Sequence, residues 1–386
     1  MPTNFAAAMR RAALSTRAYD PIEATRIIQE ALAQQAGSKQ PAADSKRPPS
    51  MRLIDPGAET IPSSRTQHAP VQRKPLGDVL RILKEGKTRF QAFETLRNRS
   101  VGTPPPPIAK GAQFIARSFA CAAGARSYEL YIPASAPTQP NGLIVMLHGC
   151  KQNPDDFATG TAMNAVAETR GLIVAYPSQN SSANASSCWN WFSPPDQVRD
   201  RGEPAIIAGI TRELISEFGI ADNRSFVAGL SAGGAMAAIM GQTYPDLYAG
   251  VGIHSGLAYG SATDVMSAFA TMRGGAPRHT HTSRARVRTI VFQGSSDGLV
   301  HPSNAERIVA QAAPEEWSRK AVQQRMQVNG RSCTRTEIGS ADGGPVVEYW
   351  LIEGAGHTWS GGHPSGTHTD VSGPNASTEM VRFFLA

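Results

Sequence analysis

The chain has 386 residues, 40% of them hydrophobic and 18% charged. This composition can bury one large core of about 250 to 280 residues, and no apolar run approaches the ~18 residues that a membrane span requires. The sequence therefore predicts a soluble globular protein and excludes a membrane-spanning one.

Basic charge is concentrated in the first part of the chain. Residues 1–100 hold 17 Lys and Arg against 9 Asp and Glu, whereas the remaining 286 residues hold 21 against 22. We interpret residues 1–110 as a basic, largely flexible extension and residues 111–386 as a catalytic domain. Such an extension suits an anionic surface, for example a coated polymer granule, although a solvated linker has the same composition. We expect no specific nucleic-acid partner.

Two parts of the extension carry apolar residues at helical spacing. They lie within residues 5–32 and residues 76–89, and four Lys and Arg residues accompany the second. These amphipathic helices could dock on the catalytic domain, pair with another chain or lie on a surface.

A short, purely apolar run, Leu143–Leu147, predicts a strand buried on both faces of a parallel sheet. It ends at His148-Gly149-Cys150, where an oxyanion hole can be built. Two backbone N–H groups aimed at a carbonyl oxygen that gains negative charge contribute on the order of 3 kcal/mol each. We expect the amides of Cys150 and Ala232 to be these donors, and His148 to shape the loop rather than to react.

Aromatic side chains gather further on, in a chain that is only 7% aromatic. Trp189 and Trp191, together with Trp359, could line a cleft for the apolar part of an ester or for a polymer strand. The alternative is that they pack in a lid or in the core. Trp359 is the preferred wall residue because it lies two positions from the expected base, His357.

The segment Gly229-Leu230-Ser231-Ala232-Gly233 fits the G-x-S-x-G nucleophile elbow, between an apolar strand-like run and a run of small residues that can start a helix. Ser231 must then lie on a strained strand-to-helix turn. A side chain two positions away on either side would collide with neighbouring backbone, which explains both glycines.

Two later strands predict an acid and a base. The run Val287–Phe292 is followed by Asp297, and the run Val346–Ile352 is followed by His357 in a Gly-rich loop. Together with Ser231 these residues give the nucleophile, acid, base order of α/β-hydrolases. The gaps leave room for a strand and a helix between successive members.

Other assignments remain open for the acid and the base. Asp297 could be a helix N-cap, and His357 could be a loop histidine bonded to a carbonyl. The competing bases and acids are His301, His363, His368, Asp264 and Asp342. His301 lies in the same loop as Asp297 and is too near it to complete the nucleophile, acid, base order. His363 and His368 come after the last predicted strand has released its loop. Neither Asp264 nor Asp342 directly follows a predicted strand.

Five motifs of the chain occur together in one known family: His148-Gly149-Cys150, Tyr176-Pro177, Cys188-Trp189-Asn190-Trp191-Phe192, Gly229-Leu230-Ser231-Ala232-Gly233-Gly234 and Gly356-His357-Thr358-Trp359. By these motifs the chain resembles the esterase family of poly(3-hydroxybutyrate) depolymerases, which also contains feruloyl and acetylxylan esterases. The resemblance spans about residues 110 to 386, a typical domain size. It implies a serine esterase with the same triad and with the amide of Cys150 in the oxyanion hole.

The expected mechanism needs no metal or diffusible cofactor. His357 takes the proton of Ser231, and Asp297 holds the imidazole in the correct tautomer and stabilises its charged form. Ser231 attacks the carbonyl to give an acyl-enzyme, which water then releases.

The four cysteines, Cys121, Cys150, Cys188 and Cys333, allow three full pairings. If a pair is bridged, we expect Cys150 with Cys188, because both flank the expected active-site loops. Residues 1–13 lack an uninterrupted apolar stretch, which predicts a cytoplasmic location with granule association. There the cysteines would mostly be reduced. Family members are often secreted, so an extracellular location is the alternative.

These observations predict an α/β-hydrolase fold, with helices on both faces of a central, mostly parallel sheet, preceded by the basic extension. The predicted function is hydrolysis of carboxylic esters, with poly(3-hydroxybutyrate), related hydroxyalkanoate polyesters or their oligomers as substrate. The alternatives are a feruloyl, acetyl or general short-chain esterase, and a granule-associated binding protein without significant turnover.

Overall fold

A computed structural model describes residues 106–135, 140–275, 287–313, 321–339 and 345–386. Residues 1–105, with both predicted amphipathic segments, lie outside the described residues, as does Asp342. Among the described residues no helix is both long enough and apolar enough to cross a lipid bilayer.

Ten strands of the described residues form one sheet, in the order β1-β2-β4-β3-β5-β6-β7-β10-β9-β8. Their bounds are β1 Gln113–Cys121, β2 Gly124–Ile132, β3 Gly142–Leu147, β4 Leu172–Pro177, β5 Ser225–Leu230, β6 Gly250–His254, β7 Arg288–Gly294, β8 Val322–Val328, β9 Arg331–Gly339 and β10 Pro345–Ile352. The strands from β4 to β10 in this order pair in parallel, and the pairs at both edges are antiparallel. The predicted mostly parallel sheet is confirmed.

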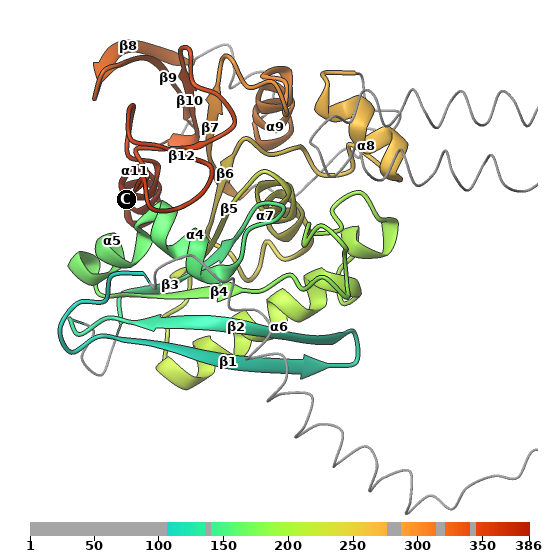
Figure 1. Cartoon of the computed structure of the whole chain (residues 1–386), viewed down its shortest axis with the longest axis vertical. Coiled ribbons are helices and arrows are strands. Elements are labelled where there is room, and N and C mark those ends of the chain that lie inside the picture. The colour runs from blue at the N-terminus through green and yellow to red at the C-terminus, as the bar shows by residue number, and fades with distance from the viewer. Residues whose placement is uncertain (1–105, 136–139, 276–286, 314–320, 340–344) are drawn as a thin grey trace, which may run out of the picture. The chain divides into compact units, whose positions relative to one another are not determined.

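Helices cover both faces of the sheet, as Figure 1 shows for α5 and α11 on one side and α6 and α7 on the other. The helices are α4 Pro154–Thr161, α5 Met163–Arg170, α6 Gly202–Phe218, α7 Ala232–Thr243, α8 Val265–Met272, α9 Ser303–Ala312 and α11 Ala376–Leu385, with the 3₁₀ helix η1 Pro194–Gln197. A separate parallel pair joins β11 Trp359–Ser360 to β12 Thr369–Asp370.

The central strands are apolar throughout because alternate side chains enter two different cores. In β3, Leu143 and Val145 pack in the core that contains residues of α6 and α7, while Ile144 and Met146 pack in the core that contains residues of α4, α5 and α11. All four side chains are fully buried.

The four runs predicted as strands form β3, β5, β7 and β10, which lie in the parallel part of the sheet. Their carboxyl ends therefore meet at one edge, hereafter the carboxyl edge. In open sheets of this kind, ligands bind outside this edge. The loops that leave it carry the predicted nucleophile, acid and base.

A column of aromatic rings crosses the core from α4 past β6 and β7 to β10. Phe157 contacts Trp359 edge to face, Trp359 stacks on His254, His254 stacks on Phe292, and Phe292 stacks on Trp350. Successive ring centroids lie 5.5, 5.2, 5.7 and 6.0 Å apart. These spacings are typical of favourable aromatic pairs, and they join the loop that carries Trp359 to the sheet.

Candidate active site

Ser231 lies between β5 and α7 on a strained turn, with φ 58° and ψ −118°. The two glycines of the motif are required by close backbone contacts. A Cβ at Gly229 would lie 2.4 Å from the carbonyl carbon of Gly233, and one at Gly233 would lie 2.0 Å from the carbonyl oxygen of Leu147. The predicted strand-to-helix turn and the reason for its glycines are both confirmed.

Asp297 and His357 form a hydrogen-bonded pair between the loops after β7 and β10. The Nδ1–H of His357 donates to Oδ2 of Asp297 over 2.8 Å. The other carboxylate oxygen accepts from the backbone N–H groups of Leu299 at 2.9 Å and Val300 at 2.8 Å. With Nδ1 protonated, Nε2 is the basic nitrogen of His357.

The surroundings of Asp297 keep its carboxylate charged. Its exposed fraction is only 5%, and Gln293 also donates to Oδ2 over 3.1 Å. Burial alone would raise the pKa of Asp297, but the hydrogen bond from His357 and the backbone N–H donors hold it below its ordinary value. Asp297 is therefore not the N-cap of α9, which begins six residues later at Ser303.

The competing candidates have other contacts. His301 and His363 are exposed, and Asp264 caps α8 in a reciprocal capping box with Ser267. His368 contacts the segment that follows His357, because its backbone carbonyl accepts the backbone N–H of Trp359 over 2.7 Å. Burial and then the positive charge of His357 lower the pKa of its imidazole. The structure thus joins Asp297 to His357.

The loop after β3 lies against the nucleophile turn. A Cβ at Gly149 would lie 3.6 Å from the Cβ of Ser231. The amide of Ala232 is the first in α7, so it has no acceptor within the helix. Neither this amide nor that of Cys150 donates a hydrogen bond to any residue that the structure describes. Within the described part of the chain, both predicted oxyanion donors are therefore without an acceptor, one of them next to Ser231 in sequence and the other next to Gly149, which lies beside Ser231.

His148 fixes the peptide that carries the Cys150 amide. Its Nε2 accepts the backbone N–H of Gln179 over 3.1 Å, so the proton lies on Nδ1 and is donated to the carbonyl of Gly149 over 2.8 Å. Burial lowers the pKa of His148 to about 4, which keeps the ring neutral. In a trans peptide the N–H points away from the C=O. Holding the Gly149 carbonyl therefore sets the direction of the Cys150 N–H.

A second set of hydrogen bonds joins this loop to the segment that follows His357. Gln152 accepts the Gly149 N–H over 2.9 Å and donates to Asp156 over 2.9 Å. Asp156 in turn accepts the backbone N–H of Thr367 over 2.8 Å. No sequence motif marks this connection, because Gln152 and Thr367 are 215 positions apart and neither belongs to a motif.

A disulfide joins Cys150 to Cys188, as predicted, and leaves Cys121 and Cys333 as free thiols. The carbonyl of Cys188 accepts from the side chain of Gln179 over 2.9 Å. Because Gln179 also holds His148, the bridge and the histidine act on the same loop. The bridge joins the pair that was expected for the bridged case, whereas the expectation that the cysteines would mostly be reduced does not hold for Cys150 and Cys188.

The predicted role of the tryptophans as walls of a substrate cleft is wrong for Trp189 and Trp359. Their exposed fractions are 0% and 1%, and Trp191 is also buried at 6%. Trp359 belongs to the aromatic column, and its indole N–H donates to Ser377 over 3.2 Å. Trp189 lies 5.8 Å from the ring of His148. Both side chains support the active-site loops from within the core.

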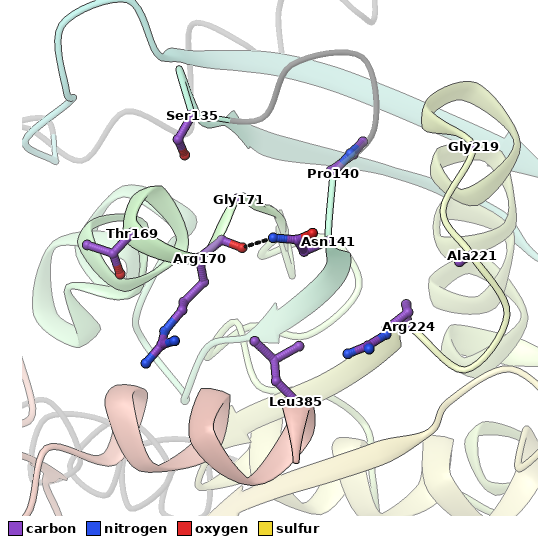
Figure 2. A pocket seen from close by; sticks show the side chains of 10 residues that line it. All are labelled: Ser135, Pro140, Asn141, Thr169, Arg170, Gly171, Gly219, Ala221, Arg224 and Leu385. Carbon is purple, nitrogen blue, oxygen red and sulfur yellow. Dashed lines mark hydrogen bonds between the residues drawn. The ribbon is translucent and has the colours of Figure 1, made fainter.

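A surface pocket of about 700 Å³ lies at the amino ends of the central strands, opposite the carboxyl edge (Figure 2). Its lining includes Asn141, Gly171 and Arg224, which directly precede β3, β4 and β5. The side-chain amide of Asn141 donates to the backbone carbonyl of Arg170 over 2.7 Å. Since Ser231 follows β5, this pocket is separate from the predicted triad. Among the described residues no cluster of His, Cys, Asp and Glu could hold a metal ion.

The fold and this arrangement of loops define the class of the protein as an α/β-hydrolase. The solved structure of an acetyl xylan esterase from Aspergillus awamori supports the fold, with a TM-score of 0.54 at 20% identity over 71% of this chain and 99% of that one. Residues 126–335 match the family model described as Esterase PHB depolymerase. The chain belongs to this family of carboxylic ester hydrolases.

Curated relatives include enzymes for two kinds of ester. Poly(3-hydroxyalkanoate) depolymerase C of Paucimonas lemoignei is 32% identical over 238 residues, which are 58% of this chain and 56% of the relative. Feruloyl esterase B of Neurospora crassa is 29% identical over 250 residues, 59% of this chain and 81% of the relative. The chain thus spans about half the length of the first of these relatives.

Proposed function

We propose that this protein is a serine ester hydrolase in which Ser231 is the nucleophile, His357 the base and Asp297 the acid. The single observation that carries the proposal is the His357–Asp297 hydrogen bond, at the same edge of the sheet as the nucleophile turn. It places the proton on Nδ1 and leaves Nε2 to take the proton of Ser231. The strained turn presents the hydroxyl above the sheet.

Catalysis then proceeds through an acyl-enzyme. As Ser231 attacks, the carbonyl oxygen gains negative charge, and the amides of Cys150 and Ala232 stabilise it. His357 becomes positively charged and is stabilised by the buried carboxylate of Asp297. It then protonates the leaving alcohol and activates the water that releases the acid.

We propose short-chain hydroxyalkanoate polyester, or its oligomers, as the substrate. The support is the family and the similarity to poly(3-hydroxyalkanoate) depolymerase C. A feruloyl or acetyl ester is the second candidate, because this chain covers 81% of the length of the feruloyl esterase. The basic N-terminal extension is proposed as a tether to an anionic granule surface, on the charge argument alone.

The test is release of hydroxyacid from amorphous poly(3-hydroxybutyrate) granules by the full chain, beside a soluble short-chain ester. Ser231→Ala is the control and is expected to abolish both activities. Turnover of both substrates supports the polyester. Turnover of the soluble ester alone favours feruloyl and acetyl conjugates over the polyester as substrates. A fully active Ser231→Ala variant overturns the assignment of the nucleophile, and absence of turnover with retained granule binding supports a binding protein.

A further inference from the structure

His254 is a buried histidine at the carboxyl edge to which the proposed mechanism gives no role. It is the last residue of β6, and this strand lies between β5, which leads to Ser231, and β7, which leads to Asp297. Its exposed fraction is 1%. A fully buried titratable group in this position costs free energy unless its polar atoms are hydrogen-bonded.

The backbone of His254 holds the nucleophile turn. Its carbonyl accepts the N–H of Ser231 over 2.9 Å. A Cβ at Gly234, in the first turn of α7, would lie 3.0 Å from the same carbonyl oxygen. The end of β6 is therefore in direct contact with Ser231 and with the first turn of α7.

The side chain of His254 holds the loop that carries the base. Its Nε2 accepts the backbone N–H of Ser360, three residues after His357, over 3.1 Å. The ring stacks on Trp359 at an interplanar angle of 27° and on Phe292 at 13°. Because Nε2 accepts, Nδ1 carries the proton, and it lies 3.2 Å from Oγ of Ser255.

His254 remains a neutral acceptor under the conditions in which the enzyme would work. Burial, with a smaller effect of the positive charge of His357, lowers its pKa to about 3. A protonated ring would turn Nε2 into a donor facing the Ser360 N–H, which would break the contact. The neutral ring thus holds this loop both by a hydrogen bond and by stacking.

We propose that His254 is a positioning residue that fixes the His357 loop relative to Ser231. The inference rests on the proposed function, since it assigns Ser231 and His357 as the reacting pair. One residue contacts the nucleophile turn through its backbone and the base loop through its ring. A displacement of about 1 Å between reacting groups can cost about 10²-fold in rate, so small shifts of this loop matter.

The test compares His254→Phe with His254→Gln in the full chain. Phenylalanine keeps the stacking but removes the acceptor for the Ser360 N–H, whereas the Gln Oε1 can replace Nε2 as acceptor. Turnover of a soluble short-chain ester is measured per active site, with sites counted by stoichiometric labelling with a serine-reactive phosphonate. Thermal unfolding is recorded for each variant. His363→Phe, the same change at an exposed histidine of the following segment, is the matched control.

We expect His254→Phe to lower kcat per labelled site by about 10- to 100-fold with KM changed less than about twofold. His254→Gln should recover at least about tenfold of that loss, and His363→Phe should match the wild type. A kcat for His254→Phe within twofold of the wild type overturns the inference. Equal loss in the Phe and Gln variants overturns it as well, since a merely structural role does not depend on the acceptor.

Ser231→Ala in the same assay separates this inference from the proposed function. If this variant retains turnover, both the proposed function and the inference about His254 are wrong. If it is inactive while His254→Phe keeps full kcat, only the inference fails.

Discussion

At the scale of single residues, the reacting turn depends on the absence of two side chains. The Cβ that alanine would add at Gly233 meets the backbone carbonyl of Leu147 at 2.0 Å, and backbone cannot move aside as a flexible side chain can. These close contacts lie between β3, β5 and α7, which is also where the proposed nucleophile and oxyanion donors lie. Strained backbone is found at Ser231 itself, with φ 58°, and functional sites commonly hold such strain.

We expect Gly233→Ala to lower the free energy of unfolding by about 3 kcal/mol or more and to abolish ester turnover. Denaturant unfolding and a soluble-ester assay measure the two effects. Gly298→Ala is the matched control, because a Cβ there has no heavy atom within 4 Å. Its stability should stay within about 1 kcal/mol of the wild type. Wild-type stability in Gly233→Ala would contradict the close contact.

The buried histidines predict how stability depends on pH. The pKa of His148 is about 4 and that of His254 about 3, both lowered chiefly by burial, against about 6.5 in the unfolded chain. Between pH 6.5 and 4 the unfolded state therefore binds protons that the folded state does not. The free energy of unfolding should fall as the pH falls through this range, by about 3 kcal/mol for each histidine at pH 4.

Urea unfolding at pH 7.5, 5.5 and 4 measures this dependence. His254→Gln should be less stable than the wild type at pH 7.5 but should lose less stability on acidification, by about 3 kcal/mol at pH 4. The same substitution at exposed His301 is the matched control. A His254→Gln variant with the full wild-type dependence would show that this ring does not contribute to it.

At the scale of elements, the disulfide and the polar contacts hold three active-site loops together. Cys150–Cys188 links the loop after β3 to the loop after β4, and Gln152 with Asp156 links the first of these to the segment after His357. The loops leave three different strands, so their relative placement depends on these links as well as on the sheet.

Removal of the disulfide should weaken both stability and turnover. For a sequence separation of 38 residues, the loss of the cross-link costs about 4 kcal/mol in the chain-entropy description. Cys150→Ala/Cys188→Ala should show this loss together with a lower kcat, because the Cys150 amide is then less firmly placed. Cys121→Ala, at an exposed free thiol, should behave as the wild type. Unchanged kcat in the double variant would show that the bridge does not position the amide.

The central strands and the order of the site residues could be predicted from the sequence, for a physical reason. Strands β3, β5 and β7 are buried on both faces and appear as short apolar runs. The edge strand β8 is mostly exposed and polar, Val-Gln-Gln-Arg-Met-Gln-Val, so no such run marks it. Each member of the proposed triad, Ser231, Asp297 and His357, follows a predicted strand within a few residues. The triad could therefore be predicted from the sequence.

The residues that support the site could not be predicted in the same way. Gln152, Asp156 and His254 act through partners that only the fold brings near them. Trp189 and Trp359 could not be placed from the sequence, because an aromatic side chain has the same sequence signature in a cleft and in a core. The preference for Trp359 as a cleft wall was wrong, since its side chain is buried. The one available signal for His254 was its place at the end of an apolar strand, followed by Ser255 and Gly256.

At the scale of the whole molecule, basic charge is concentrated in the first 100 residues of the chain. Residues 1–100 carry 17 basic against 9 acidic side chains, and the rest of the chain is nearly neutral. Any electrostatic attraction to an anionic surface therefore acts through the extension, and salt should screen it.

We expect replacement of Arg81, Lys84, Lys87 and Arg89 by Gln to weaken adsorption to granules coated with an anionic surfactant, while kcat on a soluble ester is unchanged. Sedimentation of full chain with granules at about 0.05 and 0.5 M salt measures the effect. The difference between variant and wild type should shrink at the higher salt. Adsorption that is equal for both proteins and independent of salt would contradict an electrostatic tether.

The aromatic column has an optical consequence. Two of its five rings are indoles, Trp350 and Trp359, with only the rings of His254 and Phe292 between them. Energy absorbed by either indole can pass to the other, and transfer between like rings lowers the polarisation of the emission rather than its intensity. Because the segment that carries Trp359 directly follows His357, we expect the polarisation of tryptophan emission, above the background of the other three tryptophans of the chain, to report motion of the proposed base loop.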